Sequence, residues 1–186
     1  MPTPRLRRTA TAIDAVNNRI GRSVSWLALA MVLVQFVIVV QRYVFGVGSI
    51  WMQESIIYMH ATMFLLAAGY TLLHNGHVRV DIFYREAPPR RKAVTDLFGV
   101  AVFLLPMCGA TIWLAWPYVA SSWAVLEGST APSGIDAIFL LKSTIIVFAV
   151  LVALQGISLA IRAASVLAGA PPPDAYAPDE RPPDII

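Results

Sequence analysis

The stretch SVSWLALAMVLVQFVIVVQ, residues 23–41, has no formally charged side chain in 19 consecutive positions. At a rise of about 1.5 Å per residue, a helix of this length is about 28 Å long, close to the thickness of the hydrocarbon core of a bilayer. Runs such as Leu27 to Val34 are apolar on every side, so the segment lacks the alternation of a transmembrane β-strand. The sequence therefore predicts a membrane-spanning helix here.

Three more charge-free segments follow along the chain. They cover residues 55–78, 97–126 and 143–161, and contain 24, 30 and 19 residues. Each is long enough to cross the bilayer as a helix. The predicted fold is therefore an all-α integral membrane protein with four transmembrane helices, at about 23–45, 51–74, 95–119 and 139–162.

The overall composition agrees with this prediction. Of 186 residues, 58% are hydrophobic and only 13% are charged, whereas an average soluble domain is roughly 45–50% apolar and about 25% charged. A soluble globular protein is thus excluded. Four spans are too few for most complete secondary transporters, which are often built from two structural repeats, so the length indicates a subunit. The single cysteine, Cys108, excludes an intrachain disulfide.

Lysine and arginine residues near the span ends predict the orientation. Before the C-terminal Arg162 and Arg181 are counted, one face of the predicted membrane domain carries ten of them and the opposite face only two, Arg42 and Lys142. We therefore expect both termini to be cytoplasmic. The basic pI of about 9.3 then reflects topology, and nucleic acid is not an expected partner. The ten residues are Arg5, Arg7, Arg8, Arg19, Arg22, Arg79, Arg85, Arg90, Arg91 and Lys92.

The sequence predicts three parts in the chain: an N-terminal segment, a membrane domain and a C-terminal tail. Residues 1–22 are a basic N-terminal segment in which positions 10–22 form a weakly amphipathic, interfacial helix. Residues 23–165 are the membrane domain, with a second short surface helix expected at about 77–86. Residues 166–186 are a proline-rich tail, expected to be disordered and cytoplasmic.

Polar residues within apolar spans need a reason, because burying them in lipid is costly. His60 lies near the middle of the second span; it could serve a proton relay, a haem or an ion site, but a neutral histidine bonded to a neighbouring helix is the favoured interpretation. Gln35 and Gln155 are expected to form interhelical hydrogen bonds. Glu54 is expected either to pair with Arg42 or Lys142 within the bundle or to reach water separately.

The three histidines argue against a cofactor. All lie within residues 60–77, on one span and its exit, whereas bis-histidine haem needs ligands from two facing helices. His74, His77 and Asp81 could share a helical face and bind metal, but ending the second span is the favoured role. We expect no catalytic, metal or substrate site in this chain. Pro106 and Pro117 are expected to kink or end the third span.

Several motifs together resemble one family. RYVF at 42–45, WMQE at 51–54 and LHNGHVRVD at 73–81 are similar to the small membrane subunit of tripartite ATP-independent periplasmic (TRAP) transporters. LLK at 140–142 and LQG at 154–156 resemble its mannitol/chloroaromatic-type branch. The sequence departs from the family at Gln53, where an acidic residue usually precedes Glu54.

The resemblance implies a function that composition does not show. In this family a periplasmic binding protein delivers an organic acid to a large permease subunit, which carries the substrate and sodium sites and moves. The small subunit is a static scaffold beside it in the bacterial inner membrane, in contact with membrane lipid, and is not an enzyme. The candidate structural or subunit-interface residues are Arg42, Trp51, Glu54, His60, His77, Asp81, Lys142 and Gln155.

Two other classes of protein stay open at this point. A stand-alone four-span exporter, dimeric like small multidrug carriers, would need an acidic residue at the membrane centre, and Glu54 lies near the edge. A membrane anchor of a redox complex would need haem or quinone chemistry, which the placement of the histidines disfavours.

Overall fold

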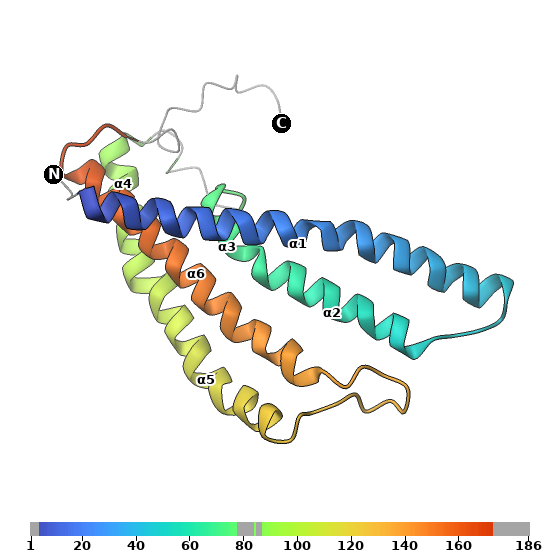
Figure 1. The fold of residues 1–186 in the computed structure, drawn as a ribbon. Helices are drawn as coiled ribbons and strands as arrows, with labels where there is room; N and C mark the ends of the chain where they lie inside the picture. The colour runs from blue at the N-terminus through green and yellow to red at the C-terminus, as the bar shows by residue number, and fades with distance from the viewer. Residues whose placement is uncertain (1–3, 78–83, 85–86, 173–186) are drawn as a thin grey trace.

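In a computed structural model, the described residues, 4–77, 84 and 87–172, form a bundle of helices with no strand among them (Figure 1). We call the end of the bundle at the links 45–49 and 125–137 the distal end, and the end where α1 begins and α6 finishes the proximal end. The elements are α1 (Pro4–Val44), α2 (Ile50–Leu66), α3 (Ala68–Leu73), α4 (Pro89–Gly99), the π-helical turn η1 (Val100–Leu104), α5 (Leu105–Ala124) and α6 (Ile138–Leu167).

These elements include four segments long and apolar enough to cross a membrane, which confirms the predicted all-α fold with four spans. They are Arg5–Val44, Ile50–Leu73, Pro89–Ala124 and Ile138–Leu167.

Helix α1 differs from the prediction at its N-terminal half. Residues 10–22 are not a separate interfacial helix but continue into the first span as one helix of 41 residues. No proline interrupts residues 5–44, which removes the strongest helix-stopping signal. The polar face also points inward: Asn17 is 1% exposed while Val16 is 48% exposed. Part of the polar face of residues 10–22 is buried because α6 supplies hydrogen-bond partners to Asp14 and Asn17.

The second span is α2 followed by α3. Ser49 caps α2, since its side-chain oxygen accepts a hydrogen bond from the Met52 backbone N–H. The chain leaves the helix after Leu73 through Asn75, whose φ of 53° is left-handed, and the Gly76 N–H donates to Thr71 O at 2.8 Å. The surface helix expected at 77–86 lies almost entirely outside the described residues.

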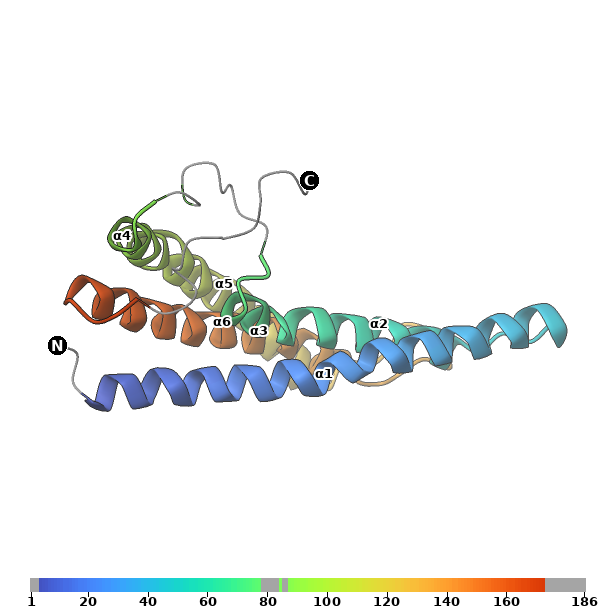
Figure 2. The same ribbon diagram turned by 90° about the horizontal axis from the view of Figure 1, so that it is seen from above.

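The third span bends where proline was expected to disturb it. Pro106 has no N–H to donate, and the turn before it, η1, is π-helical. Pro117 has a smaller effect, because α5 continues through it to Ala124. The bend lets α4, η1 and α5 follow α6 along its length, as Figure 2 shows from above.

Helix α6 forms the centre of the bundle and packs against all the other described helices. Its buried positions are mostly small, including Ala149, Gly156, Ser158 and Ala163. A Cβ added at Gly156 would lie 2.5 Å from Leu104 Cδ2, so glycine is what permits this close approach. The outer surface is apolar by contrast, with Trp113 of α5 80% exposed. Such a surface suits lipid or another membrane protein.

Candidate functional site

The proximal end holds a polar network between α1 and α6. The Asp14 carboxylate accepts hydrogen bonds from Gln155 Nε2 at 2.9 Å and Ser158 Oγ at 2.7 Å, and its second oxygen pairs with Arg162. Gln155 is 3% exposed. The interhelical hydrogen bonds predicted for Gln155 are therefore present. Together these bonds fix the position of α1 along α6.

Asn17 extends this network toward the second span. Its Nδ2 donates to Gln155 Oε1 at 2.9 Å and more weakly to Leu151 O at 3.4 Å. On its other side Asn17 lies against Gly69 of α3, where a Cβ would collide with its Oδ1. Three spans therefore meet at one buried asparagine.

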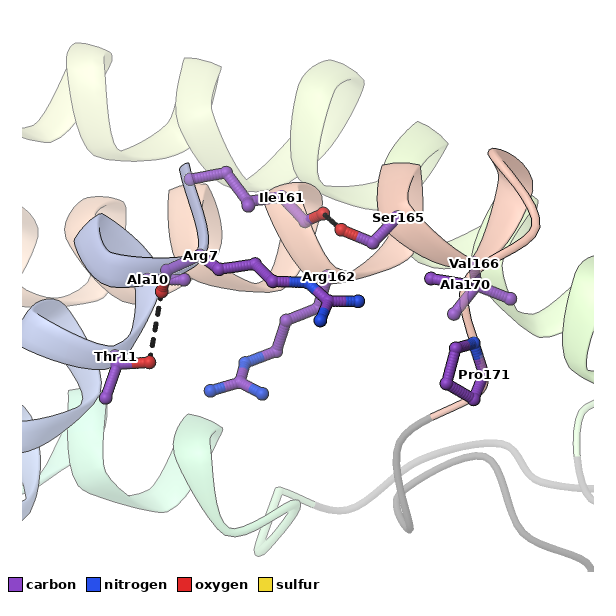
Figure 3. Close-up of a pocket in the computed structure, with 9 residues that line it drawn as sticks. All are labelled: Arg7, Ala10, Thr11, Ile161, Arg162, Ser165, Val166, Ala170 and Pro171. Carbon is purple, nitrogen blue, oxygen red and sulfur yellow. Dashed lines mark hydrogen bonds between the residues drawn. The ribbon is translucent and has the colours of Figure 1, made fainter. Parts of the chain in front are cut away.

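A pocket of about 210 Å³ adjoins the network at the proximal end. Figure 3 shows the side chains of Arg7 from α1 and Arg162 from α6 extending into it. The hydroxyls on its wall are already engaged, since Thr11 donates to Arg7 O and Ser165 to Ile161 O. Arg162 is also engaged, by Asp14. The pocket is thus an extension of the α1–α6 contact.

At the distal end, Glu54 holds the link between α5 and α6. Its carboxylate accepts hydrogen bonds from Ser129 Oγ at 2.5 Å and from the Ile135 N–H at 2.6 Å. One turn further, the Tyr58 hydroxyl donates to Ile135 O at 3.2 Å. A Cβ on Gly134 would lie 2.6 Å from Glu54 Oε2, so this glycine makes room for the carboxylate. The second span is thereby tied to residues 129–135.

Lys142 belongs to a neighbouring contact. Its Nζ donates to Glu127 Oε2 at 2.5 Å and lies 4.0 Å from the centre of the Tyr118 ring. This hydrogen bond holds the pKa of the Glu127 carboxyl below its usual value of 4.5. The expected pairing of Glu54 with Arg42 or Lys142 is therefore wrong: loop groups bind Glu54, and Lys142 pairs with the acid that precedes its own helix.

A different group of polar residues faces outward. Arg42, Gln35 and Gln53 line a groove between the distal halves of α1 and α2, with Ile38, Val39, Tyr43 and Ile56. His60 is exposed, two turns beyond Gln53 on the same face of α2, and stacks on the exposed Phe64. The helix-to-helix hydrogen bonds expected of Gln35 and His60 are not among the contacts within the described part of the chain. We call Gln35, Arg42, Gln53 and His60 the outward polar stripe.

The remaining candidates lie near span ends. Trp51 is exposed at the start of α2, as expected of an interfacial aromatic residue. His74 caps α3, and its ring packs on Tyr70 and contacts Asn18 Oδ1 at 3.3 Å. His77 is exposed, and Asp81 lies outside the described residues. Over residues 4–77, 84 and 87–172, no three histidine, cysteine or acidic side chains are arranged to hold a metal.

Sequence reasoning missed several residues that the structure brings together. Asp14 and Asn17 were only included in the predicted interfacial helix at 10–22, and Ser129 and Ser158 were not considered. Their partners are distant in sequence, as for Ser129 and Glu54, which are 75 positions apart. The sequence did contain one signal. Asp14 is an acidic side chain in a segment that leads directly into a long apolar span, and a carboxylate at such a place needs a partner.

Two comparisons with known proteins point to the same family of transporter subunits. The model of the family "Tripartite ATP-independent periplasmic transporters, DctQ component" matches residues 31–166. The chain is also 33% identical over 75 residues to the C4-dicarboxylate TRAP transporter small permease protein DctQ of Vibrio cholerae serotype O1. That match covers 40% of this chain and 32% of the relative, so it spans about a third of the relative's length. No solved structure matches the chain.

Proposed function

Because this chain belongs to the family of DctQ components of tripartite ATP-independent periplasmic transporters, we propose that it braces a large permease subunit during sodium-coupled uptake of an organic acid. The family is a component of a transporter and not an enzyme. Its members work with a large permease and a substrate-binding protein. Sodium ions and substrate then bind outside this chain, in the large subunit.

The substrate class is proposed from two sources. The Vibrio cholerae relative is named for C4-dicarboxylates, and the motifs at 140–142 and 154–156 resemble the mannitol/chloroaromatic-type branch. The proposed class is an organic acid, as the family resemblance implies and as the name of the relative fits; the branch resemblance does not narrow it. Selection of the particular acid falls to the substrate-binding protein in this proposal.

One observation carries the proposed scaffold role: three charged side chains of the span helices are used for bonds inside the chain. Asp14 binds α6, Glu54 binds the distal link, and Lys142 binds Glu127. A substrate or ion pathway would need such groups to face a water-filled route and exchange partners. Here they fix helices and links to one another, as suits a subunit that stays still while its partner moves.

The proposed placement is a bacterial inner membrane with both termini in the cytoplasm. The support is the ten-to-two distribution of lysine and arginine residues. The distal end, with Glu54 and the 125–137 link, then faces the periplasm. Fusion of an alkaline phosphatase and of a fluorescent protein to the C-terminus tests this: fluorescence without phosphatase activity is expected, and the reverse would contradict it.

A reconstituted transport assay tests the scaffold role. The complex is assembled with Glu54→Gln, and the matched control is Thr130→Ala, an exposed change in the same distal link and outside the outward polar stripe. We expect transport to slow or the complex to become less stable, with unchanged apparent substrate affinity and sodium stoichiometry. A changed sodium stoichiometry in a fully assembled Glu54→Gln complex would overturn the proposal, because it would place a coupling group in this chain.

A further inference from the structure

We propose that the outward polar stripe, Gln35, Arg42, Gln53 and His60 on α1 and α2, is the face that binds the transmembrane helices of the large permease. This inference rests on the proposed function and adds to it the position of the contact. It divides the polar residues of the spans into two groups. Glu54, Lys142 and Gln155 stabilise this chain internally, whereas the stripe is left for the partner.

Depth in the membrane is the first argument. Gln35 lies nine residues before the end of α1, and His60 lies ten residues after the start of α2. With about 1.5 Å per residue, both are about 13–15 Å from the distal helix ends, near the middle of a bilayer core about 30 Å thick. Arg42 and Gln53, near the helix ends, can reach headgroups, but Gln35 and His60 are too deep for that.

Orientation is the second argument. Gln53 and His60 lie on the exposed face of α2 together with Ile57 and Phe64. Gln35 is likewise exposed on α1. An amide and an imidazole in contact with lipid tails lose their hydrogen bonds with water and gain none, which is costly. Polar groups at this depth normally face a protein neighbour or a water-filled cavity.

The chemistry of the stripe indicates the kind of occupant. Lipid tails offer no hydrogen bonds, so a protein surface with polar side chains is needed opposite Gln35 and His60. The exposed positions of the stripe carry one fixed positive charge, on Arg42, while the nearby Glu54 is turned to the distal link. Charge complementarity therefore predicts a partner helix with a carboxylate near its periplasmic end and hydrogen-bonding side chains deeper in the membrane.

Shape supports the same face. Gln35, Arg42 and Gln53 line a continuous groove between α1 and α2. In Figure 1 the distal halves of α1 and α2 run side by side and diverge from α5 and α6. A partner helix can therefore contact the stripe without disturbing the packing around α6.

The test is co-purification of the large permease with a tagged form of this chain. The double variant Gln35→Leu/His60→Leu replaces the two deep polar groups with residues that suit lipid. The control is Trp113→Leu/Trp116→Leu, two exposed residues of α5. The conservative variant His60→Gln keeps a hydrogen-bonding group at the same depth. Each variant is also purified without the permease, and its thermal stability is measured in detergent.

We expect the double variant to recover about tenfold less permease, since it loses two hydrogen bonds inside the membrane. The control and His60→Gln should bind as the wild type does, and the double variant alone should be as stable as the wild type. Unchanged recovery with the double variant would overturn the inference while leaving the proposed function intact. So would a wild-type dimer, formed without permease, that the double variant abolishes, because the face would then bind a second copy.

A wild-type chain that binds no permease at all would instead overturn the proposed function, and the inference with it. The two failures are therefore distinguishable.

Discussion

Gln155 and Gln35 are the same residue type within apolar helices, but their surroundings are opposite. Gln155 is buried at the proximal end and bonds to both Asp14 and Asn17. Gln35 is exposed in the distal half of α1, beside a groove. The proximal region is closed, in the sense that Asp14, Asn17, Gln155, Ser158 and Arg162 form one network of bonds between α1 and α6, while the distal α1–α2 face is open. A polar residue in a span can therefore serve either the fold or an interface.

The largest effect should come from breaking the closed region at its carboxylate. In Asp14→Ala, Gln155, Ser158 and Arg162 all lose a partner. We expect a loss of about 2–4 kcal/mol in unfolding free energy, because buried polar groups are left unsatisfied. Thermal unfolding in detergent measures this. Arg19→Gln, an exposed change on the same helix, is the control, and equal stability of the two variants would show that the network contributes little.

A second change tests the same region through packing. In Gly69→Ala the added Cβ would collide with Asn17 Oδ1. We expect a loss of about 1–3 kcal/mol from overpacking. The matched control is Gly109→Ala, also in a helix but with nothing near its Cβ position, which should leave stability unchanged or raise it by up to about 1 kcal/mol. Equal destabilisation by both would contradict the close packing of α1 against α3.

Much of the fold follows from the sequence, because charge-free segments of bilayer length have few alternatives to transmembrane helices. The direction in which each helix faces does not follow in the same way. Residues around Gln35 are apolar on all sides, so periodicity could not show that this amide points outward. The partners of Glu54 were also beyond sequence reasoning, since Ser129 and Ile135 reach it through an irregular link.

Continuity of α1 is the clearest lesson of this kind. The change from an amphipathic pattern to an apolar one at residue 22 suggested two helices. Hydrophobic patterning shows which surroundings a helix meets and not where it ends; ends need a proline, a cap or a turn residue. No proline interrupts α1 before Val44, the turn-forming residues Asn18 and Gly21 stay helical, and Asp14 and Asn17 bind α6.

A smaller effect is expected at the distal link. In Glu54→Gln the carboxylate that accepts from Ser129 and Ile135 is replaced by a weaker, neutral acceptor. Backbone amides of residues 129–135 should exchange hydrogen faster, whereas those of α6 near Gln155 should not change. Hydrogen exchange with mass spectrometry measures both regions in one sample. Faster exchange throughout the chain would contradict the local role given to Glu54.

The smallest effect should be the dependence of the same link on pH. Because Lys142 lowers the pKa of Glu127 in the folded protein, the pair stabilises the link above about pH 4.5, the usual value. That contribution is lost as the pH falls through the lowered pKa. Exchange rates of residues 125–137, corrected for intrinsic chemistry, should rise in acid. Glu127→Gln should remove this rise, and a rise that persists would assign it to another group.

The contrast between a closed proximal region and an open distal face is tested most directly by photo-crosslinking in membranes that contain the large permease. A benzoylphenylalanine replaces His60 in one sample and the exposed Trp113 of α5 in another. We expect position 60 to crosslink to the permease and position 113 to give mainly lipid adducts. Crosslinking of the permease at position 113 and not at position 60 would contradict the assignment of α1 and α2 as the partner-binding face.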